Sequence, residues 1–217
     1  MTVFRRPAET RAVLFDVDGT LYTNPEYGRY QVEVMIRELA RVRGTSFEDM
    51  SAAIERTRAG FEERDGIKTS LGNAMVAHGI DIPTSVAWRT RLIDPGRFLS
   101  ADHRLRSALE ALRDLGLSLA IVTNNPRSVG LATLRALGVE DLFSAAVGLD
   151  DTMKSKPAPE PYLLAARLLA AEPASCLSVG DRYDVDLAVP LELGMGAILV
   201  DGAEDVYRLP EILRAAT

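Results

Sequence analysis

Short apolar runs that end in polar residues recur along the chain, and such runs are typical of buried strands in a parallel sheet. The runs cover residues 12–15, 117–122, 145–147, 175–179 and 197–200. Patterns typical of helices separate them, at residues 102–115, 126–138, 159–171 and 203–215. Asn125 is expected to cap the second of these helices, and Gly138 to end it. Strands that alternate with helices predict an α/β domain with a Rossmann-like, doubly wound parallel sheet.

The connection after the first run is long, because about 80 residues precede the helix that leads to the second run. This stretch has no convincing strand pattern but repeats apolar residues at helical spacing, such as Val32, Met35, Ile36 and Leu39. A structureless loop of that length is implausible in a compact domain. We therefore predict a helical cap domain at residues 24–99, inserted into a catalytic core of residues 1–23 and 100–217. We expect the cap over the carboxyl edge of the sheet, where ligands bind in open α/β folds.

The 217 residues carry a formal net charge of −6, which argues against a nucleic-acid backbone as the main partner. No apolar run approaches the roughly 20 residues that span a bilayer, and the first residues lack the apolar stretch of a signal peptide. The single cysteine, Cys176, cannot form an internal disulfide. These features predict a cytoplasmic protein that binds neither nucleic acid nor a membrane. We expect it to be a monomer or a homodimer.

Two carboxylates follow the first apolar run, at Asp16 and Asp18 in the segment Asp16-Val17-Asp18-Gly19-Thr20. Side chains at positions i and i+2 of an extended chain point the same way, so both can face one crevice. Such a pair can divide the work, with one carboxylate attacking or binding a metal while the other transfers protons. The alternative is that both residues only stabilise a turn.

Two further candidates follow the second and third runs. Thr123 and Asn124 end the second run, and this hydroxyl together with the N–H groups of the next helix predicts an anion site. The alternative is plain capping of that helix by Asn125. Lys156 follows the third run. In a chain with 22 arginines and three lysines, a retained lysine suggests a need for a compact point charge, with Lys154 as the other candidate.

Three carboxylates, Asp181, Asp184 and Asp186, follow the fourth run within six residues. Crowded like charges destabilise a fold, and a hard divalent cation with oxygen ligands would relieve them. Helix capping and the helix dipole would explain Asp184 or Asp186, but hardly all three. Because the carboxyl ends of parallel strands lie at one edge of the sheet, we expect the groups that follow the four runs to converge.

Taken together, the four segments resemble the motifs of the haloacid dehalogenase superfamily, in particular its phosphoglycolate phosphatase-like members with a helical cap after the first strand. They stand in the family's order: Asp16-Val17-Asp18-Gly19-Thr20, Thr123-Asn124, Lys156-Pro157 and Gly180-Asp181 through Asp186. The resemblance implies a Mg²⁺-dependent phosphomonoesterase. Its substrate would be a small cytosolic phosphorylated metabolite, such as phosphoglycolate, a sugar phosphate or a nucleotide monophosphate.

The resemblance also implies roles for individual residues in the reaction. Asp16 would be the nucleophile that forms an aspartyl-phosphate, and Asp18 would protonate the leaving oxygen and then activate water. Thr123 and Asn124, with nearby N–H groups, would bind the phosphoryl oxygens. Lys156 would neutralise charge on Asp16 and on the phosphoryl group.

A metal site is implied as well. Asp16, the backbone carbonyl of Asp18 and Asp181 would bind Mg²⁺, with waters completing an octahedron. Asp186 and Asp184 would support these ligands from behind.

The chain departs from the family's pattern at three places. Many members carry Asp-Ser where this chain has Thr23-Asn24, a frequent serine is replaced by Arg182, and a frequent small residue by Pro190. The first departure weakens the assignment of the substrate but not of the chemistry, because it falls in the hinge region towards the cap.

Four other functions on the same fold stay open as alternatives. A dehalogenase resembles the family but lacks the second aspartate of the first motif, so Asp18 argues against it. A phosphonate hydrolase would need an amine in the cap, where Lys68 is the only lysine. A phosphosugar mutase shares the first motif. A non-catalytic phosphate-binding regulator would not need both aspartates.

Overall fold

The computed structural model describes residues 1–65 and 71–214, and the chain divides into two compact units. The first unit comprises Met1–Asn24 and Asp94–Thr217, and the second comprises Pro25–Ile93. Within the described ranges, no helix is both long enough and apolar enough to cross a membrane.

The second unit is shorter than the expected cap of residues 24–99. The difference lies mainly at its end, where the short helix η1 (Pro95–Arg97) belongs to the first unit because it packs against α6 (Arg127–Ala136). The sequence did not indicate this earlier boundary, because a helix of three residues is too short to show a helical period. Lys68, the cap amine considered for a phosphonate hydrolase, lies outside the described residues.

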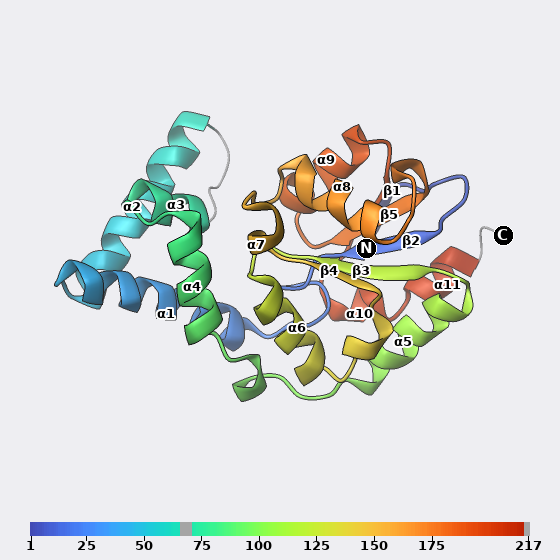
Figure 1. The fold of residues 1–217 in the computed structure, drawn as a ribbon, viewed down its shortest axis with the longest axis horizontal. Coiled ribbons are helices and arrows are strands. Elements are labelled where there is room, and N and C mark those ends of the chain that lie inside the picture. Colours follow the sequence, from blue (N-terminus) through green and yellow to red (C-terminus); the bar gives the residue numbers. More distant parts are fainter. Residues whose placement is uncertain (66–70, 215–217) are drawn as a thin grey trace. The chain divides into compact units, whose positions relative to one another are not determined.

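A six-stranded sheet with the order β1-β6-β5-β2-β3-β4 forms the centre of the first unit (Figure 1). Its strands are β1 (Thr2–Arg5), β2 (Ala12–Phe15), β3 (Ser118–Val122), β4 (Ala145–Val147), β5 (Cys176–Gly180) and β6 (Gly196–Leu199). Five of them run parallel, and β1 pairs antiparallel with β6 at one edge. β2 lies between β3 and β5, with Phe15 opposite Ile121 on one side and Val179 on the other.

Helices cover both faces of this sheet, as Figure 1 shows. One face carries α8 (Pro159–Leu168) and α9 (Ala188–Glu192), and the other carries α5 (His103–Asp114), α6, α10 (Ala203–Val206) and α11 (Leu209–Arg214). Short helical turns complete the unit: α7 (Leu149–Thr152), η2 (Glu140–Leu142), η3 (Pro173–Ser175) and the π-helical η4 (Tyr183–Leu187). Alternate strand residues such as Leu14 and Val122 pack against Tyr162 and Ala165 of α8. The predicted Rossmann-like, doubly wound α/β fold is therefore confirmed.

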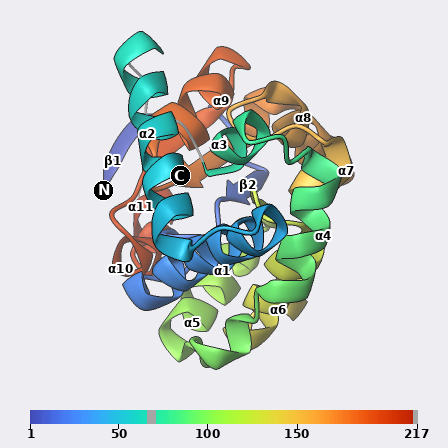
Figure 2. The same cartoon turned by 90° about the vertical axis from the view of Figure 1, so that its left-hand side faces the viewer.

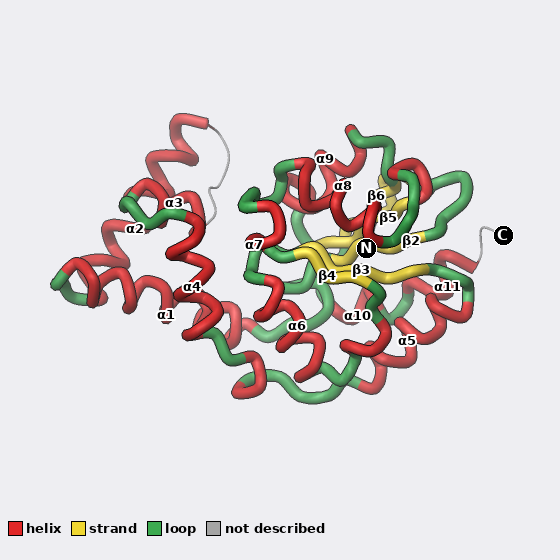
Figure 3. Tube along the Cα trace, viewed as in Figure 1, coloured by secondary structure: helices red, strands yellow, loops and turns green. Residues whose placement is uncertain are grey.

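The second unit consists of helices and loops throughout its described residues (Figures 2 and 3). Its helices are α1 (Pro25–Arg43), α2 (Phe47–Asp65), α3 (Leu71–Ala77) and α4 (Ile82–Leu92). They bury a core of their own around Met35, Leu39, Ile54 and Met75, and Trp88 packs against it. A separate core explains why this stretch forms a compact unit, because each helix covers the apolar side of another.

Two local predictions are wrong, and one strand was not predicted. Strand β1 was not expected, because all four of its residues are exposed and show no apolar alternation. The helix expected at residues 203–215 is divided in two, since Pro210 lacks an N–H and fits only in the first turn of α11. Asn125 does not cap α6, because Pro126 occupies the N-cap position.

Candidate active site

The polar residues that follow the strands meet at one edge of the sheet, because β3, β2 and β5 run side by side in the same direction. Asp16 follows β2, Thr123 follows β3 and Asp181 follows β5. Backbone bonds extend the ladder to these positions: the N–H of Asp16 donates to the carbonyl of Val179, and that of Thr123 to Val147, each at 2.9 Å. The chain adds strands first on one side of β2 and then on the other, and such reversal points bind ligands in open α/β sheets.

The ammonium group of Lys156 lies between two carboxylates. Its Nζ is 2.5 Å from Oδ1 of Asp16 and 2.7 Å from Oδ1 of Asp186. The side chains of Lys156, Asp16 and Asp186 are only 2%, 10% and 4% exposed. Removing charges from water is costly unless they are compensated, and here one positive charge faces two negative ones. When both carboxylates are ionised, this buried triad therefore carries a surplus of one negative charge.

Burial and crowding shift the pKa values of the site. Loss of hydration, together with the charges of Asp186 and Asp18, raises the pKa of Asp16 from 3.8 to about 8 against the lowering effect of Lys156. Burial, with the charge of Asp186, also raises the pKa of Asp181 to about 6. Burial lowers the pKa of Lys156, but Asp16 and Asp186 outweigh it and the net shift is upward. The lysine therefore stays charged, but its single positive charge cannot balance all of the neighbouring carboxylates when they are ionised.

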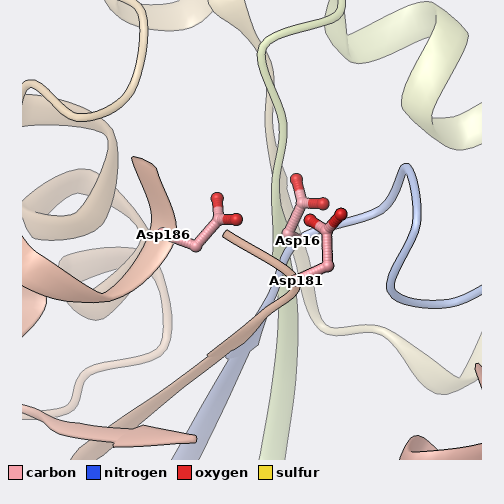
Figure 4. A group of neighbouring side chains, drawn as sticks. All are labelled: Asp16, Asp181 and Asp186. Atoms are coloured by element: carbon pink, nitrogen blue, oxygen red, sulfur yellow. The ribbon is translucent and has the colours of Figure 1, made fainter. Parts of the chain in front are cut away.

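Asp16, Asp181 and Asp186 each offer an oxygen, and these three oxygens lie within 4.8 Å of one another. In Figure 4 the carboxylates of Asp16 and Asp181 lie next to each other, and Asp186 points toward them from a separate segment. Both oxygens of Asp186 already accept hydrogen bonds, Oδ1 from Lys156 and Oδ2 from the N–H of Arg182 at 3.1 Å. Oδ1 of Asp16 also accepts from Lys156, but its Oδ2 accepts a longer hydrogen bond, from the Thr20 hydroxyl at 3.4 Å. Asp16 and Asp181 are therefore the better candidates for metal ligands, and Asp186 orients the lysine.

The turn after Asp18 brings the backbone close to Asp181. Gly19 has a φ of +82°, and a Cβ at this position would lie 2.6 Å from Oδ2 of Asp181. Glycine is required both for this conformation and for this close approach. The approach leaves a cradle between the Asp181 carboxylate and the backbone beside Asp18. Grouped oxygen donors around such a cradle fit a hard cation such as Mg²⁺.

Asp18 is held at both of its carboxylate oxygens. Oδ1 accepts a hydrogen bond from the hydroxyl of Tyr22, and Oδ2 accepts one from Nδ2 of Asn125 at 2.9 Å. Tyr22 belongs to the turn after β2, and Asn125 to the segment after β3. Neither contact is visible in the sequence, where Asn125 has the position of a helix cap and no local signal distinguishes the two uses.

The two predicted phosphate-binding residues behave differently. Oγ1 of Thr123 accepts a hydrogen bond from the N–H of Asn125 at 3.1 Å, so its own hydrogen can be donated to an anion. The side chain of Asn124 instead holds the backbone of Lys156: Oδ1 accepts from the N–H at 2.7 Å, and Nδ2 donates to the carbonyl at 3.3 Å. Asn124 therefore positions the segment that carries the lysine.

Two other candidates lie away from the cluster. Asp184 forms an ion pair with Arg182 at 2.7 Å, in which both side chains are more than 40% exposed (45% and 42%). Residues two apart on a helical turn lie on nearly opposite sides of it, so η4 buries Asp186 and exposes Asp184. Lys154 is exposed, whereas Lys156 is buried. The structure therefore brings Asp186 and Lys156 into the site and leaves Asp184 and Lys154 outside it.

A family model described as haloacid dehalogenase-like hydrolase matches residues 10–194 of the chain. A phosphoglycolate phosphatase from Salmonella choleraesuis is 31% identical over 195 residues, which cover 82% of this chain and 77% of that protein. A ribulose-1,5-bisphosphate 5-phosphatase from Halopiger xanaduensis is 28% identical over 222 residues, covering 95% of this chain and 91% of the relative. All four strand-end segments of the site lie within the range that the family model matches.

Solved structures share the fold over nearly the whole chain. A phosphatase of the same superfamily from Thermococcus onnurineus matches with a TM-score of 0.62 and 23% identity, covering 94% of this chain and 98% of that one. A 2-haloacid dehalogenase from Pseudomonas syringae pv. Tomato matches with a TM-score of 0.61 and 20% identity, covering 96% and 100%. Identities this low relate the folds and leave the reaction to be argued from the site.

Proposed function

The chain belongs to the haloacid dehalogenase-like hydrolase family and is a phosphatase, and on that premise we propose that it hydrolyses phosphomonoesters of small cytoplasmic metabolites with Mg²⁺ through an aspartyl-phosphate. The observation that supports this most is the setting of Asp16. Its carboxylate follows the central strand, lies 2.5 Å from the Lys156 ammonium and is grouped with that of Asp181. A carboxylate in this position can attack phosphorus while neighbouring positive charge stabilises the phosphoryl oxygens.

The reaction would take place in two steps. In the first, an oxygen of Asp16 attacks phosphorus and the bond from phosphorus to the ester oxygen breaks, while protonated Asp18 gives its proton to that oxygen. The alcohol leaves, and Asp18 is then a carboxylate. In the second step, water attacks the phosphorus of the aspartyl-phosphate, Asp18 takes a proton from that water, and the bond between phosphorus and the Asp16 oxygen breaks. Inorganic phosphate leaves, and both aspartates return to their starting states.

The surplus negative charge of the buried triad would repel a phosphate dianion. Asp16, the backbone carbonyl of Asp18 and Asp181 would hold Mg²⁺, which supplies the positive charge that both the carboxylates and the phosphoryl group need. Lys156 supplies a second, permanent positive charge, and Asp186 and Asn124 hold it in place. The hydroxyl of Thr123 would donate to a phosphoryl oxygen, as preorganised donors do at sites where charge develops.

The substrate class follows from the relatives. By their names, two of them act on phosphoglycolate and on ribulose 1,5-bisphosphate. Both names denote phosphate esters of small polar molecules. We propose that this chain acts on esters of the same class, and these two compounds are the first to test.

Phosphate release from a panel of small phosphomonoesters tests the proposal. The panel contains phosphoglycolate, ribulose 1,5-bisphosphate, sugar phosphates, nucleotide monophosphates and p-nitrophenyl phosphate. The wild type should release phosphate with Mg²⁺ and stop when EDTA removes the ion. Asp16→Asn should lower kcat by about 10⁴-fold or more, because it removes the nucleophile.

Asp114→Asn is the matched control, because it makes the same chemical change at an exposed position at the end of α5. Its activity should stay within about twofold of the wild type, as expected for a surface substitution away from the site. A folded wild type that binds Mg²⁺ but releases no phosphate from any ester would contradict the proposal.

A further inference from the structure

We infer that Tyr22 and Asn125 are positioning residues that hold the carboxyl group of Asp18 in the orientation needed for proton transfer. The inference rests on the proposed function, in which Asp18 acts first as an acid and then as a base. Its basis is that each oxygen of Asp18 has its own hydrogen-bond donor, and that these donors come from two different strand ends.

Tyr22 is tied to Asp18 through both its backbone and its side chain. The two residues form an isolated parallel bridge, and the phenol hydroxyl donates to Oδ1 of Asp18. The N–H of Leu21 closes the intervening turn by donating to the carbonyl of Val17 at 3.0 Å. Tyr22 is only 6% exposed, so packing fixes its ring. The position of the hydroxyl is therefore set by the same turn that carries Asp18.

Asn125 reaches the other oxygen from the end of β3. Its Nδ2 donates to Oδ2 of Asp18 at 2.9 Å. Its backbone is anchored twice, since its N–H donates to Oγ1 of Thr123 at 3.1 Å and its carbonyl accepts from the N–H of Leu149 at 2.9 Å. Asn125 is 5% exposed. An amide that is buried and anchored in this way is preorganised to hold the carboxyl group of a distant segment.

The chemistry of the two donors suits a group that must first give and then take a proton. The amide Nδ2 of Asn125 can only donate, so it keeps Oδ2 as an acceptor throughout. The hydroxyl of Tyr22 can donate or accept, so it can stay bonded to Oδ1 whether or not that oxygen carries the proton. Asp18 can therefore keep one orientation through both steps. Without either partner, the carboxyl group could rotate away from the leaving oxygen, while Asp16 would still be able to attack.

The acidity of the leaving group distinguishes this role from a general effect on the site. An alkyl phosphate needs a proton on its ester oxygen as the bond breaks, whereas p-nitrophenolate leaves with much less help from an acid. The constant kcat/KM includes the steps up to phosphoryl transfer. A defect in the positioning of Asp18 should therefore lower kcat/KM for an alkyl ester far more than for p-nitrophenyl phosphate.

The experiment compares Tyr22→Phe and Asn125→Ala with the wild type on the best alkyl ester of the panel and on p-nitrophenyl phosphate. Each variant should lower kcat/KM for the alkyl ester by about 10- to 100-fold and for p-nitrophenyl phosphate by less than about threefold, as a partial loss of acid catalysis predicts. The Kd for Mg²⁺, measured by isothermal titration calorimetry, should stay within about threefold, because neither side chain is a proposed metal ligand.

Tyr207→Phe is the matched control. The hydroxyl of Tyr207 donates to the carboxylate of Asp102 at 2.5 Å, and Asp102 has no proposed role in the reaction. Tyr207 lines the same pocket as Tyr22, so the variant tests a nearby tyrosine that does not bond to Asp18. This variant therefore loses the same kind of tyrosine–aspartate contact. The ratio of its kcat/KM values for the two esters should stay within about twofold of the wild-type ratio, since a contact that does not involve Asp18 acts on stability.

Equal losses for both esters, or no loss for either, would overturn the positioning role. If Tyr22→Phe does not fold, as judged by its thermal unfolding, the ratio of the two esters in Asn125→Ala decides the question. A wild type that hydrolyses neither ester would overturn the proposed function together with this inference. An active wild type whose variants keep the ratio of the two esters would overturn the positioning role alone.

Discussion

Each of the two units contains a group of three ionisable side chains, two acidic and one basic in the first unit and one acidic and two basic in the second. In the first unit, Lys156 lies between Asp16 and Asp186, at 2.5 and 2.7 Å. In the second unit, Glu38 lies between two arginines, with its oxygens 2.9 Å from Arg41 and 2.6 Å from Arg91. With all three members ionised, each group has one unbalanced charge, negative in the first unit and positive in the second.

Burial decides what that unbalanced charge does. The arginines beside Glu38 are 69% and 57% exposed, so water solvates the surplus positive charge and the group needs no ligand. Hydrogen bonds from Arg41, opposed by burial and joined by those from Arg91, lower the pKa of Glu38 to about 2. The Lys156 group is almost entirely withdrawn from water, and this burial, together with the charges of Asp186 and Asp18, raises the pKa of Asp16 against the lowering effect of Lys156. A bound cation would compensate the ionised carboxylates. The two groups therefore differ in solvation: water compensates the surplus charge beside Glu38, whereas the group around Lys156 needs a bound cation.

Among the tests of this comparison, replacing Lys156, which removes the ammonium from the buried group, should have the largest effect. Lys156→Met keeps an unbranched side chain only one atom shorter but leaves Asp16 and Asp186 without their counter-charge. We expect kcat/KM for the best ester to fall by about 10³-fold, the size of effect seen when a charge-stabilising donor is removed from an active site. Steady-state kinetics with saturating Mg²⁺, together with thermal unfolding to confirm the fold, measures this.

Lys154→Met is the control for that change, because Lys154 lies two residues away and is exposed. Its kcat/KM should remain within about twofold of the wild type, as for other surface positions. A Lys156→Met enzyme that keeps more than a tenth of the wild-type kcat/KM would show that the buried charge is dispensable.

A smaller effect is expected on the pH dependence of stability. The pKa of Asp16 is about 8 in the folded chain and 3.8 by ordinary values, and that of Asp181 rises to about 6. The folded chain therefore binds more protons than the unfolded chain between about pH 4 and pH 8, and stability in EDTA should fall as the pH rises through this range. Tm in EDTA should therefore fall between pH 5 and pH 8, by about 2–4 °C for each 1 kcal/mol of stability lost.

Thermal unfolding in EDTA measures this slope, and Asp16→Asn separates the contribution of the site from that of the rest of the chain. The variant should lose less stability than the wild type over the same range, because its amide does not titrate. Mg²⁺ should raise Tm more at pH 8 than at pH 5, since it binds the deprotonated carboxylates. Identical slopes for the two proteins would count against the raised pKa of Asp16.

The smallest effect is expected in the second unit. Glu38→Gln should lower the free energy of unfolding by about 1–2 kcal/mol at pH 7, because it weakens charge-assisted hydrogen bonds to two arginines. The lowered pKa of Glu38 means that this stabilisation is present above the ordinary value of 4.5 and is lost as the pH falls toward about 2. Urea unfolding at pH 7 and pH 3 should therefore show a difference between variant and wild type that shrinks at the lower pH.

Glu33→Gln on the same helix is its control. Glu33 is 49% exposed and 3.8 Å from Arg37, so its ion pair is solvated and should contribute less than about 0.5 kcal/mol. Equal losses for the two variants would mean that the burial of Glu38 adds nothing, and that the distinction drawn between solvated and buried groups fails within this unit.

The sheet and the candidate catalytic groups were predictable because both depend on residues that are close together in the sequence. The runs that became β2, β3, β4, β5 and β6 are buried on consecutive residues, and apolar continuity is the signal of a strand inside a parallel sheet. The polar residues at their ends could be assigned to one edge because parallel strands share a direction. Strand β1 was not predicted, because an exposed edge strand has no such run of apolar residues.

The sequence by itself determined the α/β fold, the inserted helical unit and the groups that follow each strand, because strand and helix periods and strand direction depend on neighbouring residues. Only the tertiary structure decided which members of these groups are used. It buries Lys156 and leaves Lys154 exposed, and it turns Asn125 from a cap into a partner of Asp18. The contacts responsible join residues 140 positions apart for Lys156 and Asp16, and 107 apart for Asn125 and Asp18. Burial and charge at the site arise from segments that meet only in the folded chain, so no local pattern encodes them.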